Sequence, residues 1–111
     1  MTADNLILLI LAQAGGQLSG KTLLQKRAYF ISKILNFQLG FKPHFYGPFS
    51  SEIENATGQC KYLILKERQA PFTVEGIQKA AGKLGWEISP EAVQKAVTFL
   101  TNSDLLAKAH S

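Results

Sequence analysis

The residues whose types and spacing carry the clearest chemical meaning lie between positions 15 and 22. Gly15, Gly20, Lys21 and Thr22 match the phosphate-loop pattern of a glycine, four residues, and then glycine, lysine and threonine. In a phosphate loop, backbone amides surround the phosphates, the lysine contacts the terminal ones and the threonine holds Mg²⁺. One hypothesis is therefore a small nucleotide-binding protein that uses Gly15–Thr22.

The surrounding sequence favours another structure for this segment. In such proteins, an acidic residue that directly follows a run of four apolar residues supplies the second magnesium-binding carboxylate. No acidic residue of this chain has that position. The other apolar segments repeat with a helical period, and 111 residues leave little room for a parallel sheet. We expect Gly15 and Gly16 to end a first helix over roughly Asn5–Ala14, and Lys21 to lie in the first turn of the next helix.

Two amphipathic segments near the C-terminal end form a second pattern. Val74–Leu84 and Pro90–Asn102 are joined by a short turn that begins with Gly85, and Leu105–Lys108 is a candidate short strand. Two helices joined by a tight glycine turn are typical of a helix-turn-helix. The polar face of the later helix carries Gln94, Lys95 and Thr98. Glutamine can pair with adenine, and lysine can contact guanine or phosphate, so these residues are candidates for DNA binding. The alternative is a helical hairpin with a solvated polar face.

A helix from Ser19 or Gly20 to about Leu35 is expected between these patterns. On a helical wheel, one arc is apolar and comprises Leu24, Ala28, Ile31 and Leu35, with Leu23, Phe30 and Ile34 beside it. The other side holds Gln25, Lys26, Tyr29, Ser32 and Lys33. Lys26, Tyr29 and Lys33, with Lys21 near the helix start, are candidates for contacts with a phosphate backbone or a protein partner. The alternative is a solubilising surface.

Arg27 is the exception on this wheel because it projects into the apolar arc. A charge on a buried face needs a partner. Glu52 or Glu54, at the start of a third helix with capping-box spacing from Ser51, can supply a carboxylate. Stacking on the aromatic segment 41–49 is the other possibility. We expect a buried, partnered Arg27 with a structural role.

Two motifs within residues 5–65 resemble a group of small prokaryotic proteins. The first is the helix with Leu24-Gln25-Lys26 and Tyr29, and the second is Tyr46-Gly47-Pro48-Phe49-Ser50. The group includes winged-helix-like proteins and, more remotely, the antitoxin-type domain called Panacea (SocA-like). The resemblance implies an α-rich, winged-helix-like fold, a regulatory or protein-binding role and no cofactor. It also implies that the Leu24-Gln25-Lys26 helix packs on the Tyr46-Gly47-Pro48 loop.

Composition excludes several classes of protein. The 111 residues are 46% hydrophobic and 18% charged, which is enough to bury a core. Cys60 is the single cysteine, so internal disulfides and multi-cysteine zinc motifs are excluded, and a reducing, cytoplasmic location is expected. The apolar run Leu6–Ala12 is too short for a membrane span. No nucleophile–base pair stands out, so we expect neither an enzyme nor a metal site.

The net charge of +4 permits nucleic-acid binding without requiring it. Residues 1–60 carry five basic and three acidic side chains, and residues 61–111 carry seven and five, so the basic excess is spread evenly. No charged tail marks one end of the chain as a nucleic-acid arm.

These observations predict a mostly α, winged-helix or helix-turn-helix-like single domain over residues 1–111, with a minor β element. Its parts are a family-like helical part of about residues 1–68 and a helix-turn-helix-like part of about residues 72–108. The first functional hypothesis is a regulatory protein that binds double-stranded DNA. The alternative is an antitoxin-like or adaptor module that binds a protein or a second copy through Tyr29, Tyr46 and Phe49.

Overall fold

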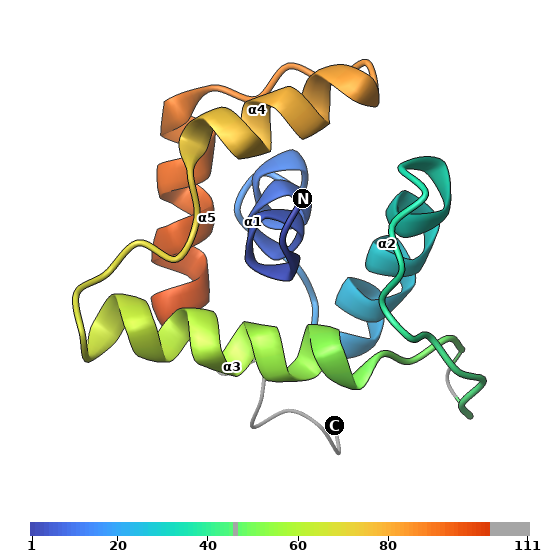
Figure 1. Ribbon diagram of the computed structural model, residues 1–111. Coiled ribbons are helices and arrows are strands. Elements are labelled where there is room, and N and C mark those ends of the chain that lie inside the picture. Colours follow the sequence, from blue (N-terminus) through green and yellow to red (C-terminus); the bar gives the residue numbers. More distant parts are fainter. Residues whose placement is uncertain (46, 103–111) are drawn as a thin grey trace.

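The computed structural model describes residues 1–45 and 47–102, and these residues form five helices. The helices are α1 (Ala3–Gln13), α2 (Lys21–Ile34), α3 (Ser51–Leu65), α4 (Val74–Lys83) and α5 (Pro90–Asn102). In Figure 1, α1 is seen almost end-on at the centre, and the other four helices surround it. The expectation of a mostly α protein is confirmed. None of these helices is both long and apolar enough to cross a membrane.

The central position of α1 follows from its sequence. All eight residues from Asn5 to Ala12 are buried, because the helix is apolar on every face. Asn5 is the polar exception, and its Oδ1 accepts a hydrogen bond of 3.2 Å from the backbone N–H of Thr73. That contact ties α1 to the residue that caps α4, since the Thr73 hydroxyl accepts from the Gly76 N–H.

The segment that matches the phosphate-loop pattern is a helix end followed by a helix start, as predicted. Gly15 and Gly16 have φ values of 75° and 82°, which glycine adopts readily and other residues adopt rarely. The Gly16 N–H donates to the Leu11 carbonyl at 2.8 Å, which closes the end of α1. Lys21 is the first residue of α2. A helix precedes the glycines, whereas a phosphate loop follows a strand, so this segment lacks the structure that the nucleotide-binding hypothesis requires.

The helix pair α4 and α5 forms where the sequence predicts it. The Trp86 N–H donates to the Ala81 carbonyl at 2.9 Å after Gly85, and the Ser89 hydroxyl accepts from the Ala92 N–H at 3.1 Å. Both helices pack mainly on α1 and make few direct contacts with each other. The specific helix-turn-helix and winged-helix assignments stay predictions. The candidate strand Leu105–Lys108 lies outside the described residues.

The minor β element is a single antiparallel bridge within the part of the chain that the structure describes. The Lys42 N–H donates to the Phe49 carbonyl at 2.8 Å, and the Phe49 N–H donates to the Lys42 carbonyl at 2.9 Å. We call the described residues of this segment, 42–45 and 47–49, the hairpin. The hairpin leads directly into α3, whose N-cap is Ser50, one residue before the Ser51 expected from the capping-box spacing.

The buried face of α2 differs from the face predicted by the wheel. Leu24, Ala28 and Ile31 are buried as expected, but Gln25 and Ser32 are buried with them. Phe30 and Ile34, placed in the apolar arc, are 66% and 67% exposed. The helix is rotated because α2 rests on α1 and α3, and the Gln25 amide has hydrogen-bond partners there.

The predictions of a buried Arg27 and of its carboxylate partner are wrong. Arg27 is exposed, on the side of α2 that faces away from the core. Glu54 pairs with Lys21 instead, and Glu52 is an exposed residue near Gly40. The wheel assumed that the helix side richest in apolar residues is buried, and tertiary packing chose the neighbouring side.

Replacing Arg27 with alanine is therefore expected to change the free energy of unfolding by no more than about 0.5 kcal/mol, because an exposed side chain is removed. Leu24→Ala, one turn earlier and 1% exposed, is the control and should cost about 3 kcal/mol. Chemical denaturation of both variants measures the difference. A loss of several kcal/mol for Arg27→Ala would contradict the exposed placement.

Candidate interaction surfaces

The polar arc of α5 faces solvent. Gln94, Lys95 and Thr98 are all exposed, as the DNA hypothesis requires. A β-carbon on Gly16 would lie 3.2 Å from the Lys95 Cβ, so the turn after α1 packs directly against this helix. Between them lies an open cleft of about 470 Å³, which Gln17 and Asn102 also line. Contact of this arc with DNA stays a prediction.

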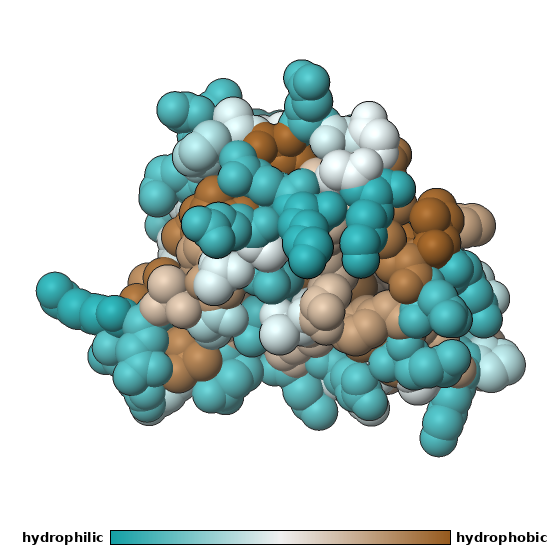
Figure 2. Space-filling view, turned by 45° about the horizontal axis from the view of Figure 1, so that its top comes forward, coloured by the Kyte–Doolittle hydropathy of each residue, from teal (hydrophilic) through white to brown (hydrophobic). Residues whose placement is uncertain are grey.

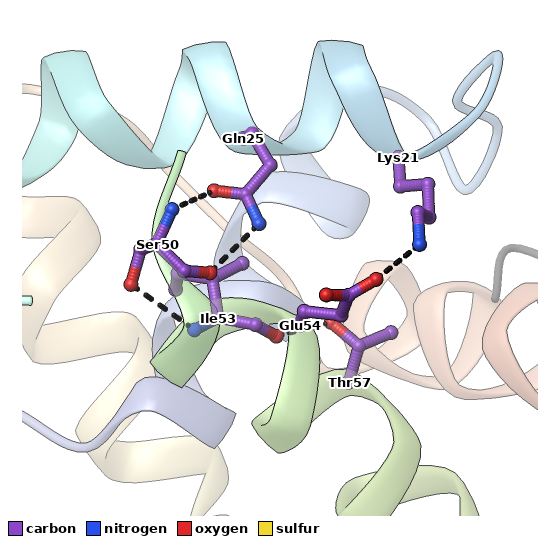
Figure 3. Close-up of polar contacts among 6 residues, drawn as sticks. All are labelled: Lys21, Gln25, Ser50, Ile53, Glu54 and Thr57. Atoms are coloured by element: carbon purple, nitrogen blue, oxygen red, sulfur yellow. Dashed lines mark hydrogen bonds and ion pairs between the residues drawn. The ribbon is translucent and has the colours of Figure 1, made fainter. Parts of the chain in front are cut away.

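Of the lysines predicted to bind along α2, Lys26 and Lys33 share one exposed side of the helix and Lys21 does not. Lys26 and Lys33 are exposed, and the Lys33 Nζ lies 5.3 Å from the centre of the Tyr29 ring, a cation–π contact. Lys21 is turned toward α3, where it forms an ion pair with Glu54 (Figure 3). The candidate surface on α2 therefore contains Lys26, Tyr29 and Lys33 without Lys21.

The hairpin packs against α2, as the resemblance implies. A β-carbon on Gly47 would lie 3.3 Å from the Lys26 Cε, and the rings of Tyr29 and Phe41 are 5.2 Å apart, edge to face. Phe49 is half-buried and lies 5.5 Å from the His44 ring. Tyr46, a candidate partner-binding residue, lies outside the described residues.

Phe45 at the tip of the hairpin is 97% exposed. Its ring lies edge to face with the neighbouring His44 ring, with the centroids 5.9 Å apart, and nearly all of it is open to solvent. The sequence analysis named its neighbours Tyr46 and Phe49 and missed Phe45. The aromatic composition of residues 41–49 was the only available signal.

A buried amide joins α2 to the start of α3 (Figure 3). The Gln25 Nε2 donates to the Ser50 carbonyl at 2.9 Å, and the Gln25 Oε1 accepts from the Ser50 N–H at 2.8 Å. The Ser50 hydroxyl accepts from the Ile53 N–H and donates to the Leu39 carbonyl. This arrangement sets both the end of the hairpin and the first turn of α3. Gln25 is a structural residue that sequence reasoning placed on the wrong side of its helix.

Apolar and cationic side chains share the outer face of α2. In Figure 2, hydrophobic surface is visible at the right, the side on which Figure 1 draws α2. The exposed Phe30 and Ile34 belong to this helix, and the exposed Arg27 lies one turn before them. We call this face and the hairpin tip the α2–hairpin surface. Its members are Lys26, Arg27, Tyr29, Phe30, Lys33, Ile34, Lys42 and Phe45.

Charged residues are unevenly distributed along the sequence that forms this surface, although the two halves of the chain have the same excess of basic over acidic residues. No acidic residue occurs between Asp4 and Glu52, whereas five basic residues do. These are Lys21, Lys26, Arg27, Lys33 and Lys42. The next carboxylates in the sequence belong to the start of α3, where Glu54 is paired with Lys21. The surface is therefore cationic with an apolar centre.

Cys60 lies on the inner face of α3 and is fully buried. Burial, and secondarily the nearby Asp4 carboxylate, raises the pKa of its thiol to about 12. The side chain is then a neutral thiol at physiological pH and a poor nucleophile. Among the described residues, no cluster of histidine, cysteine, aspartate and glutamate side chains could hold a metal ion.

The Cys60 thiol should react with Ellman's reagent at pH 8 only as fast as the protein opens. Adding denaturant should make the reaction rapid, because the unfolded thiol has a pKa of about 8.5. The folded pKa is raised, so this group stabilises the fold below about pH 8.5, and that contribution falls as pH rises toward 12. The variant Cys60→Ala/Gln59→Cys, with a thiol at the exposed neighbouring position, should react at once in the folded protein. Equally rapid reaction of native Cys60 would contradict its burial.

Comparisons of the chain with models of protein families, with curated proteins and with solved structures find no match.

Proposed function

We propose that this protein is a non-enzymatic interaction module, antitoxin-like or adaptor-like, that binds another protein through the α2–hairpin surface. The observation that carries the proposal is the exposure of Phe30 and Ile34 beside Arg27 on α2. Large apolar side chains around an arginine are typical of the centre of a protein–protein interface. Isolated exposed apolar residues are common, whereas Phe30 and Ile34 lie four residues apart on one face of the same helix, beside the exposed Arg27.

The chemistry of the residues favours a protein over a nucleic acid at this surface. Lysines and aromatic rings suit either partner, because phosphates attract lysine and bases stack on rings. Ile34 is aliphatic and 67% exposed, and it offers neither charge nor a stacking face. Its burial by an apolar side chain of a partner would be favourable. The resemblance to a protein-binding antitoxin domain supports the same class of function.

A selection from a displayed random peptide library tests the proposal. The targets are the unmodified chain, the variant Phe30→Ser/Ile34→Ser and the control variant Tyr62→Ser/Leu65→Ser. The control removes two α3 side chains that are 49% and 47% exposed, so similar apolar area is lost elsewhere. We expect peptides that bind the unmodified chain and the control and fail to bind the α2 variant. Peptides that bind all three equally, or none at all, would contradict the proposal.

DNA binding through α5 is the second candidate, and the solvent-facing Gln94, Lys95 and Thr98 favour it. It ranks second because Glu91 lies on the same polar arc and repels phosphates, and Lys95 is the single cation among these four residues. A DNA surface needs several cations for useful affinity.

If α5 binds DNA, Lys95→Gln should weaken binding to all duplexes and reduce the slope of log affinity against log salt by about one. Gln94→Ala should instead relax preference at one base pair. Lys79→Gln, at an exposed position on α4, is the matched control. Fluorescence anisotropy with duplexes at several salt concentrations measures both effects. Salt dependence that is unchanged by Lys95→Gln would exclude this helix as the DNA-contacting element.

A further inference from the structure

Four side chains on α2 follow the spacing of a helix–helix seam. Leu23, Arg27, Phe30 and Ile34 are separated by four, three and four residues, which places them in one stripe along the helix. Phe30 and Ile34 are two-thirds exposed, Arg27 is exposed and Leu23 is half-buried. We call these four residues the outer seam. It is about 17 Å long, because a helix rises 1.5 Å per residue.

The residues that flank the outer seam differ on its two sides. Lys26 and Lys33 are seven positions apart and lie exposed along one side. In heptad terms, they occupy the g positions when Arg27 and Ile34 occupy a. Leu24 and Ile31 lie on the other side and belong to the core of the protein itself. A second helix placed on the seam would therefore meet cations along one edge and the protein along the other.

Arg27 limits what can cover the seam. A docked helix would remove water from its guanidinium, which is costly unless a carboxylate faces it. A second copy of α2 would place Arg27, Lys26 and Lys33 against the same cations, and like charges at an interface disfavour association. The sequence from residue 5 to residue 51 offers no carboxylate of its own. The charge of the occupant must therefore be negative.

We propose that the outer seam binds an acidic amphipathic helix of a partner protein, with apolar residues at heptad spacing and a carboxylate opposite Arg27; this inference rests on the proposed function. Leu23, Phe30 and Ile34 bind the apolar residues of the partner. Lys26 and Lys33 pair with acidic residues along its edge. At the N-terminal end of the seam, an open cleft of about 600 Å³ lies between Leu23, Arg27 and the Phe99 side chain of α5. That cleft accepts one large side chain at the end of the partner helix.

Three stapled synthetic helices test the proposal by fluorescence anisotropy with the whole chain. The first has leucine at a and d, except for one glutamate opposite Arg27, and glutamate at the flanking positions. The second replaces each glutamate with lysine, and the third replaces each leucine with serine. We expect the first to bind about tenfold or more tightly than either of the others. Stapling makes all three helical before binding, so that helix formation does not bias the comparison.

Two protein variants make the test specific to the seam. Phe30→Ser/Ile34→Ser should lower the affinity for the acidic helix by about tenfold or more, whereas Tyr62→Ser/Leu65→Ser should leave this affinity unchanged. The Arg27→Glu variant should no longer bind the acidic helix and should bind the lysine helix instead. All substituted side chains are exposed, so the fold should be retained, and a melting curve of each variant checks this.

The outcomes separate this inference from the proposed function. Equal binding of the acidic and lysine helices would contradict the inference that the partner helix is acidic. Library peptides that still require Phe30 and Ile34 would, in that case, still support the proposed function. Absence of any peptide that depends on these residues overturns both. Dimerisation of the unmodified chain that Phe30→Ser/Ile34→Ser abolishes makes a second copy the occupant and overturns the inference. Competition by duplex DNA at the seam has the same consequence.

Discussion

Gln25→Leu is expected to lower the free energy of unfolding by about 3 kcal/mol. The leucine fits the helix, but it leaves the buried N–H of Ser50 without a partner, and it removes one of the two hydrogen bonds to the Ser50 carbonyl, which still accepts from the Glu54 N–H. The unsatisfied N–H costs about 1–3 kcal/mol, and the lost hydrogen bond to the carbonyl adds about 0.5–1.5 kcal/mol. For a domain of this size, the melting temperature should fall by about 12–20 °C. Thermal and urea denaturation followed by circular dichroism measure the loss.

Gln59→Leu is the matched control, because Gln59 is an exposed glutamine on α3. Its effect should remain within about 0.5 kcal/mol. Gln25→Glu provides a second check. A protonated glutamic acid can replace the amide, but its carboxylate repels the Ser50 carbonyl, so the folded pKa is raised above about 4.3. The stability of this variant should therefore be highest in acid and fall as pH rises through the raised pKa. A pH-independent loss would show that the hydrogen bonds to Ser50 are unimportant.

Leu9→Ala is expected to cost about 3–4 kcal/mol, the range of buried leucine truncations that leave a cavity. Leu9 has no exposed surface, and its helix α1 is enclosed by the four others. The surrounding helices cannot close the space without losing their contacts with the other α1 residues. Urea denaturation should show a lower midpoint with an unchanged slope, because the same surface is exposed on unfolding.

Leu65→Ala on α3 is the control for this truncation, since its side chain is 47% exposed. The same three carbon atoms are removed, but water already contacts much of that surface, so the expected loss is below about 1 kcal/mol. Equal losses for the two leucines would contradict the central position of α1. A changed urea slope for Leu9→Ala would indicate that the variant no longer unfolds in one step.

The amide of Gln25 also connects the fold to the proposed interaction surface. It holds Ser50, which follows the hairpin, and the hairpin carries Phe45 and Lys42. Exposed functional side chains need a rigid scaffold, because ordering them at the moment of binding reduces affinity. The two motifs that suggested a family resemblance thus meet in the structure as the contact that positions the hairpin on α2.

Local signals in the sequence determined the helices of this protein. The uniformly apolar α1 segment, the glycines after it and the Ser89-Pro90 start of α5 each act within a few residues, and each structure was predicted correctly. Capping and helix termination depend on backbone groups near in the sequence, so a single chain is sufficient to identify them. The packing of the hairpin on α2 was implied by the family resemblance, because no local rule gives a contact between segments so far apart in the sequence.

Only the tertiary structure decided which side of α2 is buried. By sequence, Phe30 and Ile34 belong in a core and Gln25 belongs in water, and a helical wheel can only follow that preference. The structure reverses both, because Ser50 offers a buried donor and acceptor that a glutamine satisfies, and because no helix covers the opposite side. Two hydrogen bonds to a residue 25 positions away, invisible to any local pattern, therefore determined that Arg27, Phe30 and Ile34 face outward.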